Sequence, residues 1–351
     1  LIIFGWIMSF SASLAHLNSY NSFFKQALFI VAGLSAGLVI LNTPISVLQK
    51  YSIPLFILSL ILLAVVFFPK IGHEVNGSYR WINFVFFKFQ PSELMKLSMI
   101  LFMAGFLIRQ EKDVRKPWMG FVKTMAIIFV AVILVVTEKD IGATLIISMT
   151  AMAMLFAAGT YLKQLAYFIP GAIITTSIIV YFEQNRFLRV MEYLTDPSQV
   201  HQTWQALIGI ARGGWFGTGL GGGIQKYTLL PEPQTDMIFA IIGEELGVLG
   251  MLFVLLSYAY ILGKGFNIAK IALKKGRKYS SYVAFGICTW FAMQVTVNIG
   301  VNLGLLPVTG FTLPLISYGG SSMIISIISL AILLRVDMEN RTNYSKQIKY
   351  V

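Results

Sequence analysis

One acid of this chain stands where a general base would be useful. Asp236 ends the segment LPEPQTD (230–236) and directly precedes a long apolar stretch. Two prolines in that segment restrict how the chain approaches the acid. A partly desolvated carboxylate at a water–lipid boundary has its pKa raised toward the range useful for proton abstraction. The competing interpretation is structural, with Asp236 and Thr235 sharing the cap of a helix.

A second candidate pair opens another apolar stretch. Glu93 and Lys96 are three residues apart, so they share one face of a helix. They form either a local ion pair, with the lysine stem along apolar surface, or a cation that faces a cavity for an anionic head group. The spacing alone leaves both interpretations open.

Two further acids, Asp140 and Glu245, are predicted to have structural roles. Asp140 follows Glu138 and Lys139 in a tight turn and begins an apolar stretch, where an acid caps the first turn and complements the helix dipole. Glu244 and Glu245 are adjacent inside a span, which packing does not explain. Glu245 lies on the helix face opposite Asp236, so it is predicted to pair with a cation on a neighbouring helix as a brace.

Several other chemistries are excluded or disfavoured. His16, His73 and His201 are far apart and show no metal-ligand spacing, and Cys288 is the only cysteine, so a cysteine redox pair is ruled out. The glycine-rich run 217–223 lacks the Lys-Ser/Thr that follows a phosphate-binding loop. It is interpreted as a compact turn, with phosphate binding as the weaker alternative.

The elements that position these residues are apolar helices. Of 351 residues, 57% are hydrophobic and 12% charged, and the mean hydropathy is +0.76. This composition excludes a water-soluble globular domain, a disordered chain and a coiled coil. A span needs about 20 apolar residues, and ten candidates are predicted, near 2–14, 26–43, 52–69, 93–109, 120–137, 140–159, 162–182, 237–262, 281–304 and 312–335.

Charge places these spans relative to the membrane. The chain has 27 Lys and Arg against 15 Asp and Glu, and most of the basic residues fall in one set of alternate loops and the C-terminal tail. The positive-inside rule therefore puts both termini in the cytoplasm. The basic cluster at 264–278 is interpreted as this orientation signal, with anionic lipids as a secondary contact, and no nucleic acid is expected.

Two long loops face the other side. Residues 70–92 and 183–236 are rich in aromatic residues and arginine, and they are expected to lie on the membrane face as short amphipathic pieces. We expect one integral membrane domain over residues 1–351, with 183–236 as a large extracytoplasmic loop between spans seven and eight. The chain begins at Leu1 without a Met, so a missing cytoplasmic N-terminus is expected.

Four blocks of sequence resemble one family. NIGVNLGLLPVTGFTLPLISYGGSS (298–322) resembles the signature of the SEDS proteins (shape, elongation, division and sporulation). The blocks at 230–247, at 76–82 with 89–96, and at 211–221 match further family blocks in the same order. One departure is the family's Pro-Asp-Xaa-Gly-Thr, here Lys139-Asp-Ile-Gly-Ala143, which puts the geometry of this turn in doubt. The runs at 300–304 and 241–245 favour the division branch over the elongation or sporulation branches.

The resemblance implies a fold, an activity and residue roles. SEDS proteins are all-α proteins of ten transmembrane helices in the bacterial cytoplasmic membrane, and they polymerise lipid II into peptidoglycan outside it. By resemblance, Asp236 is the general base and undecaprenyl diphosphate is the leaving group. The resemblance also suggests that cations contact the diphosphate or head group, and that other acids orient these cations or brace helices. The contacts are Arg80, Lys96 and Arg212, and the supporting acids are Glu93, Asp140 and Glu245.

The resemblance also implies partners and leaves alternatives. A class B penicillin-binding protein is expected to cross-link the new strand, and other septal (divisome) proteins are expected beside it. No ligand cluster identifies a metal, so Mg²⁺ or Mn²⁺ at Asp236 stays open. The alternatives are a lipid II flippase and a non-catalytic scaffold of the division machinery.

Overall fold

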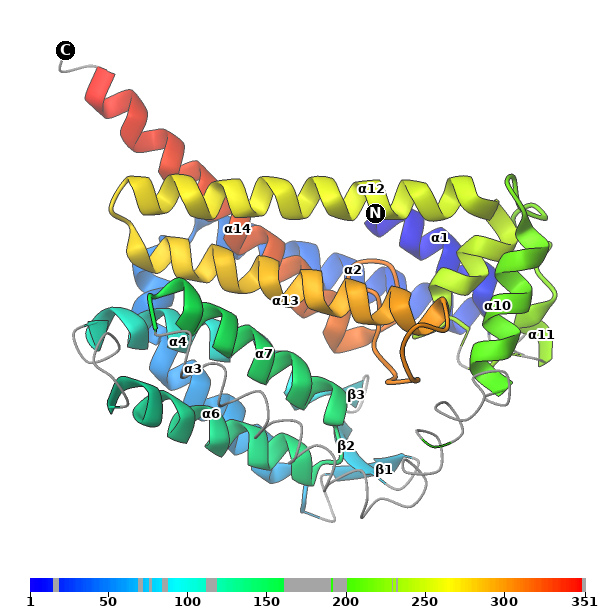
Figure 1. Ribbon diagram of the computed structural model, residues 1–351, viewed down its shortest axis with the longest axis horizontal. Helices are drawn as coiled ribbons and strands as arrows, with labels where there is room; N and C mark the ends of the chain where they lie inside the picture. Colours follow the sequence, from blue (N-terminus) through cyan, green and yellow to red (C-terminus); the bar gives the residue numbers. More distant parts are fainter. Residues whose placement is uncertain are drawn as a thin grey trace. The chain divides into compact units, whose positions relative to one another are not determined.

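The computed structural model of this chain is mostly helical (Figure 1). It describes residues 1–14, 19–68, 72–75, 78–83, 88–111, 119–160, 191, 201–228, 230–231 and 233–348. The expected seventh span, 162–182, lies outside the described residues. So do residues 183–200 of the long loop, apart from Met191.

Among the residues that the structure describes, six helices are long and apolar enough to cross a membrane. They are α2 (Ser19–Asn42), α3 (Ile45–Val65), α4 (Pro91–Arg109), α12 (Ile238–Lys274), α13 (Lys278–Asn302) and α14 (Gly320–Ile348). Shorter apolar stretches lie in α1 (Ile2–Ser13), α6 (Met119–Thr137) and α7 (Ile141–Ala157). The prediction of a helical multi-span protein is therefore confirmed, while the count of ten spans and their orientation stay predictions.

Two compact units divide the chain. Unit 1 comprises Leu1–Val31, Gly171–Ile261 and Ala292–Met323, and unit 2 comprises Ala32–Pro170, Leu262–Phe291 and Ile324–Val351. Neither unit is continuous in sequence, because the division falls within α2, α12, α13 and α14.

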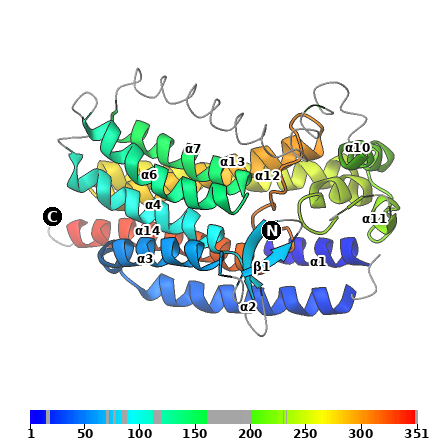
Figure 2. The same cartoon turned by 90° about the horizontal axis from the view of Figure 1, so that it is seen from below.

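In unit 2, α3, α4, α6 and α7 pack side by side (Figure 1; Figure 2). The hydroxyls of Ser59 on α3 and Ser98 on α4 share a hydrogen bond of 2.7 Å. The rings of Phe56 and Phe102 stack at 4.4 Å between the same two helices. Small and aromatic residues thus let α4 lie deep in the unit, with Glu93 and Lys96 in its first two turns.

The first long loop forms strands, which corrects the all-α expectation. Strands β1 (Gly72–Val75), β2 (Ser78–Asn83) and β3 (Lys88–Phe89) make a small antiparallel sheet in the order β1-β2-β3. The run SYRWIN of β2 explains the difference, because aromatic and β-branched residues favour strands over a surface helix. Arg80 is presented by this strand.

Several helix boundaries differ from the prediction: α2 begins at Ser19 and α3 at Ile45, before the predicted starts at 26 and 52, and α14 runs on to Ile348. The expected span 237–262 continues to Lys274, so part of the basic cluster lies on α12. The expected span 312–335 begins only at Gly320, because Pro314 interrupts a helix and Leu315 has a φ of 69°. Residues 303–319 are therefore an irregular segment that connects α13 with α14.

Unit 1 encloses the start of α12. Residues 237–242 are all buried in one apolar cluster, together with Leu313 and Ile316 from the irregular segment. Two loop helices, α10 (His201–Gly213) and α11 (Gln225–Thr228), also belong to this unit. Inside α12, Gly247 has a φ of 65° and a ψ of −162°, which kinks the helix two residues after Glu245.

Candidate functional site

Asp236 lies two residues before α12 and is 8% exposed. The hydroxyl of Thr235 donates a hydrogen bond of 3.1 Å to its carboxylate Oδ1. The buried apolar residues that follow hold the start of α12 in the core of unit 1. The acid is therefore largely withdrawn from bulk water and lies at the start of a helix that is fixed in the core.

Side chains from α13 and the irregular segment bind the backbone around Asp236. Asn298 and Asn302 each donate from Nδ2 to the carbonyl oxygen of Asp236, both at 2.9 Å. The hydroxyl of Ser317 donates to the carbonyl of Thr235 at 2.5 Å. The N–H of Tyr318 donates to the carbonyl of Gln234 at 2.8 Å. Three consecutive carbonyls, 234 to 236, are thus held from elements more than 60 residues away in the sequence.

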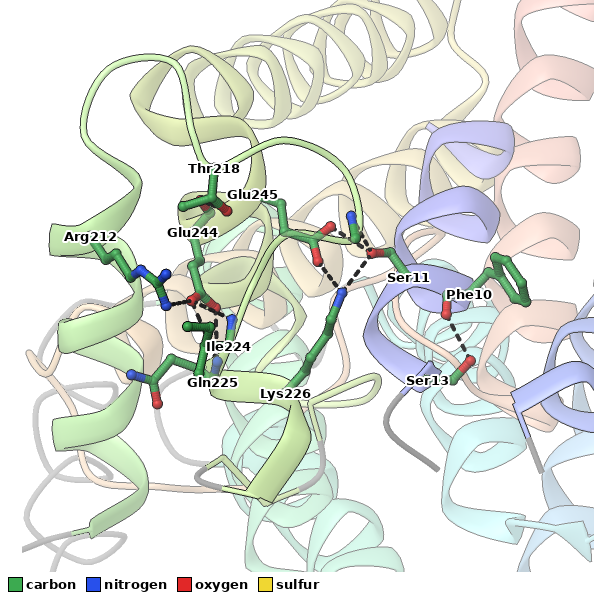
Figure 3. A network of polar contacts seen from close by, with 11 residues as sticks. Phe10, Ser11, Ser13, Arg212, Thr218, Ile224, Gln225, Lys226, Glu244 and Glu245 are labelled. Atoms are coloured by element: carbon green, nitrogen blue, oxygen red, sulfur yellow. Dashed lines mark hydrogen bonds and ion pairs between the residues drawn. The ribbon is translucent and has the colours of Figure 1, made fainter. Parts of the chain in front are cut away.

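Glu245 is part of a buried ion pair in the same unit (Figure 3). Its Oε1 lies 2.6 Å from Nζ of Lys226, and neither side chain is exposed. The hydroxyl of Ser11 donates to Oε2 of Glu245 at 2.6 Å and accepts from Lys226 at 3.3 Å. The cation therefore comes from the short loop helix α11, and the pair joins α1, α11 and α12.

Glu244 holds the loop that leads to this ion pair (Figure 3). Its carboxylate accepts the N–H of Ile224 at 2.7 Å and that of Gln225 at 3.3 Å, which caps the start of α11. Nη1 of Arg212 on α10 lies 3.6 Å from the same carboxylate. Arg212 is thus placed beside Glu244, with its side chain 41% exposed.

The glycine-rich run is a compact turn bound to α12. The N–H groups of Thr218 and Gly219 donate to the carbonyls of Glu244 and Glu245, both at 3.0 Å. The N–H of Gly221 donates to the hydroxyl of Ser11. These N–H groups are used inside the protein, so the run does not present them as a phosphate cradle.

In unit 2, Lys96 and Glu93 form an ion pair of 2.9 Å with both side chains buried. Nζ of Lys96 also lies 5.0 Å from the ring centroid of Trp290, within range of a cation–π interaction. The ion pair and the ring together stabilise a buried ammonium that a lone carboxylate would hold less well.

Asp140 caps α7 and binds the start of α4. Its Oδ1 accepts the N–H of Ala143 at 3.1 Å, as the sequence predicts for a cap. Its Oδ2 accepts from Ser92 and Gln90, both at 3.0 Å. Lys139, which replaces the family's proline, has a φ of 61° that a proline ring cannot adopt. The local turn therefore differs from one built on proline.

Arg80 and Glu138 meet at this turn. The guanidinium of Arg80 donates to the carbonyls of Glu138 (3.2 Å) and Lys139. The side chain of Glu138 is fully buried, and within the described part of the chain neither of its carboxyl oxygens has a hydrogen-bond partner. The pKa of Glu138 is raised to about 9, first by burial and second by the charge of Asp140, while the charge of Arg80 acts in the opposite direction.

The structure thus gathers the predicted residues within each unit. Arg80, Glu93, Lys96 and Asp140 cluster where β2, α4 and the α6–α7 turn meet in unit 2. Arg212, Asp236 and Glu245 belong to unit 1, where Arg212 pairs with Glu244. Across the described ranges, no group of three His, Cys, Asp or Glu side chains could hold a metal ion.

Sequence reasoning missed several partners. Asn298, Asn302, Ser317 and Lys226 are not predicted as site residues from the sequence. Two asparagines four residues apart in an apolar span are a usable signal, because a buried amide needs hydrogen-bond partners. Nothing local in the sequence indicates that Lys226 pairs with Glu245.

The fold and these sites define a multi-pass membrane protein with buried, hydrogen-bonded acids. A family model described as a cell cycle protein, FtsW/RodA/SpoVE, matches residues 1–342. The chain belongs to this family.

Relatives match over nearly the whole chain. A probable peptidoglycan glycosyltransferase FtsW of Legionella pneumophila is 42% identical to this chain over an alignment of 351 residues. The alignment covers 97% of this chain and 89% of the relative. A protein of the same name from Thiomonas intermedia is 39% identical, with 97% and 87% covered.

Solved structures show the same fold. A chain of a peptidoglycan synthase complex, described as coordinating polymerization and crosslinking, aligns with a TM-score of 0.79 at 26% identity, covering 97% of both chains. A variant of the rod shape determining protein RodA from Thermus thermophilus aligns with a TM-score of 0.71 at 25% identity, covering 97% of this chain and 94% of the other.

Proposed function

We propose that this chain is a peptidoglycan glycosyltransferase that polymerises lipid II during cell division. The observation that carries the proposal is the full-length similarity to relatives named FtsW and described as glycosyltransferases. The site adds an acid suited to the chemistry, because Asp236 is shielded from water and bound to rigid elements.

Asp236 is the proposed general base. The 4-hydroxyl of the acceptor GlcNAc attacks the anomeric carbon of the donor sugar, and its proton passes to the Asp236 carboxylate. The bond from that carbon to the diphosphate breaks, and undecaprenyl diphosphate leaves with the electron pair. An α-linked donor then gives a β-linked product in one inversion, so no covalent enzyme intermediate is needed.

Cations are proposed to offset the charge that grows on the leaving group. Arg80, Lys96 and Arg212 are the proposed contacts to the diphosphate or head group. Arginine is suited to bidentate phosphate contacts and lysine to a point-charge contact. The pairs of Lys96 with Glu93 and of Arg212 with Glu244 support this by holding each cation in one orientation.

A divalent cation has no step in this mechanism. Among the described residues, no group of three His, Cys, Asp or Glu side chains could hold a metal ion, so a Mg²⁺ or Mn²⁺ ion at Asp236 would also need the substrate diphosphate as a ligand. Activity with Mg²⁺ or Mn²⁺ against activity in EDTA tests whether the substrate diphosphate needs such an ion.

The proposed setting is the bacterial cytoplasmic membrane at the septum. Ten spans with both termini cytoplasmic would place Asp236 at the outer face. The synthase complex among the structural neighbours supports a penicillin-binding protein as partner. We further propose contacts with lipids and with other septal proteins.

The test is polymerisation of purified lipid II by this protein in complex with its cognate penicillin-binding protein. We expect Asp236→Asn to abolish polymer while the complex still forms. Asp337→Asn, the same change at an acid paired with Arg341 on α14, is the matched control and should keep full activity. Equal polymer from Asp236→Asn and the parent would exclude the base role.

The alternatives have their own outcomes. A non-catalytic scaffold predicts no polymer from the parent, with Asp236→Asn still supporting division in cells. A flippase predicts translocation of lipid II in liposomes by both the parent and the Asp236 variant, again without polymer.

A further inference from the structure

We propose that Asn298 and Asn302 are positioning residues, which act on the reaction by holding the backbone of Asp236 in one place. This inference rests on the proposed function, because it assigns the two amides to the proposed base. Both side chains are almost completely buried, with 1% and 0% exposed.

The two amides converge on one atom. Asn298 and Asn302 are one helical turn apart on α13, so they face the same way. Both donate to the carbonyl oxygen of Asp236 at 2.9 Å. A carbonyl oxygen has two lone pairs, so this acceptor is saturated by side chains of a different helix.

Asn302 also forms a hydrogen bond with the first turn of α12. Its Oδ1 accepts the N–H of Ala240 at 2.9 Å in the first turn of α12, and the same N–H also donates to the carbonyl of Met237 at 3.1 Å. One side chain therefore binds the residue at the proposed base and the helix start four residues on. This double contact fixes both the position and the direction in which the chain passes from Asp236 into α12.

Asn298 ties in the irregular segment. Its Nδ2 donates to the carbonyl of Phe311 at 2.5 Å as well as to Asp236. From the same segment, Ser317 accepts the N–H of Leu313 and donates to Thr235. The segment therefore lies against residues 234–236. It binds the carbonyls of Gln234 and Thr235, while α13 binds the carbonyl of Asp236.

This arrangement goes beyond what helix stability needs. Two buried amides in an apolar helix stabilise the fold only if all their polar atoms are hydrogen-bonded. Apolar residues of similar size at these positions would give the folded state similar stability. Here both amides donate to the carbonyl of one acid, and their other contacts include the N–H of Ala240 and the carbonyls of Phe311 and Asn298. A general base must be held to within a fraction of an ångström, and a displacement of about 1 Å can cost on the order of 100-fold in rate.

The test measures polymerisation kinetics of the complex with its penicillin-binding protein. We expect Asn302→Ala and Asn302→Asp to lower kcat by about 10- to 100-fold while KM for lipid II changes less than about 3-fold. Asn302→Asp keeps the acceptor for Ala240 but sets an oxygen against the Asp236 carbonyl, so it should be at least as severe as Asn302→Ala.

Asn298→Ala removes one of two donors and should have a smaller effect in the same direction. Asn340→Ala is the matched control, since this asparagine is also buried but donates to the carbonyl of Ile268. The pH dependence of kcat is the second readout. We expect its acidic limb to move in the Asn302 variants and to stay in place in Asn340→Ala, which a loss of general stability would not produce.

The outcomes separate the two proposals. If Asp236→Asn is inactive but the Asn298 and Asn302 variants keep the kcat and pH profile of the parent, the positioning role is wrong and the base role stands. If Asp236→Asn is fully active, both fall. If the asparagine variants fail to form a monodisperse complex, the amides are structural and the positioning role is overturned.

Discussion

Glu245 and Lys226 form an ion pair of 2.6 Å in which both side chains are fully buried. The two residues are 19 positions apart in sequence, with Lys226 on α11 and Glu245 on α12. Their contact holds α11 against α12 and so fixes the segment between them. Buried charges are stable only when they are paired and hydrogen-bonded, and Ser11 completes the set. This relationship makes the pair a brace for unit 1.

Removing one member of this pair should destabilise the protein strongly. We expect Lys226→Met to lower the free energy of unfolding by about 3–5 kcal/mol, because it leaves the Glu245 carboxylate buried without its cation. The measurement is the midpoint of thermal unfolding of the purified protein in detergent. Adding Glu245→Gln to Lys226→Met should recover part of the loss, since the stranded charge is then removed.

The control is an exposed ion pair, Arg341 with Asp337. Arg341→Met should change stability by less than about 1 kcal/mol, because such pairs are screened by water. Equal midpoints for Lys226→Met and Arg341→Met would show that the buried pair is no brace.

Asp140 is expected to act through its hydrogen bonds. Asp140→Ala removes the cap of α7 and the acceptor for Ser92 and Gln90, which should cost roughly 1–3 kcal/mol. Asp140→Asn keeps the acceptor for Ala143 and should lose less. Unfolding midpoints of both variants, with polymer yield beside them, test this order. An Asn variant that loses as much stability as the Ala variant would show that the charge of Asp140, and not its hydrogen-bond acceptor, is what matters.

The pKa of Glu138 predicts a pH dependence of stability. Burial raises it from 4.5 to about 9, so between these values the folded chain holds a proton that the unfolded chain releases. The contribution of Glu138 to the free energy of unfolding therefore falls as the pH rises through this range and is constant above it.

Glu138→Gln should remove that slope and raise stability at pH 8 by roughly 1–3 kcal/mol. Unfolding midpoints from pH 5 to about 9 provide the measurement. Glu111→Gln, at an acid that pairs with Lys278 and is partly exposed, should keep the slope of the parent. A slope that persists in Glu138→Gln would contradict the assignment.

Substitutions at Lys96 and Glu93 test whether the Lys96 ammonium binds the substrate or only stabilises the fold. Lys96→Gln should raise KM for lipid II by about 10-fold or more if the ammonium contacts the diphosphate, and Glu93→Gln should have a smaller effect because the cation remains. Initial rates over a range of lipid II concentrations measure this. If both variants lose stability equally and keep KM, the pair is only a structural ion pair.

Gly247 tests the kink of α12. Its φ of 65° disfavours other residues, and an added Cβ would lie 2.6 Å from the backbone of Trp215 and Gly217. Gly247→Ala should therefore destabilise the protein by more than about 1 kcal/mol. Gly263→Ala, on the same helix with open space around its Cα, should be neutral or slightly stabilising in the same unfolding assay.

Much of this could be predicted from the sequence because the signals are local or compositional. Apolar length placed the helices that the structure describes, and the position of Asp140 at a helix start predicted its cap. The β2 strand and the late start of α14 were mispredicted, since each depends on neighbours or backbone angles that hydropathy does not encode.

The sequence by itself determined the family, the apolar helices and the short list of acids. The acids could be listed because burying a charge in an apolar span costs free energy, so such charges are few. Only the tertiary structure decided which partner each acid has. Lys226 meets Glu245, and two asparagines of α13 meet the carbonyl of Asp236, over 62 and 66 residues of sequence. Such pairings arise when packed helices bring distant segments together, and no local spacing specifies them.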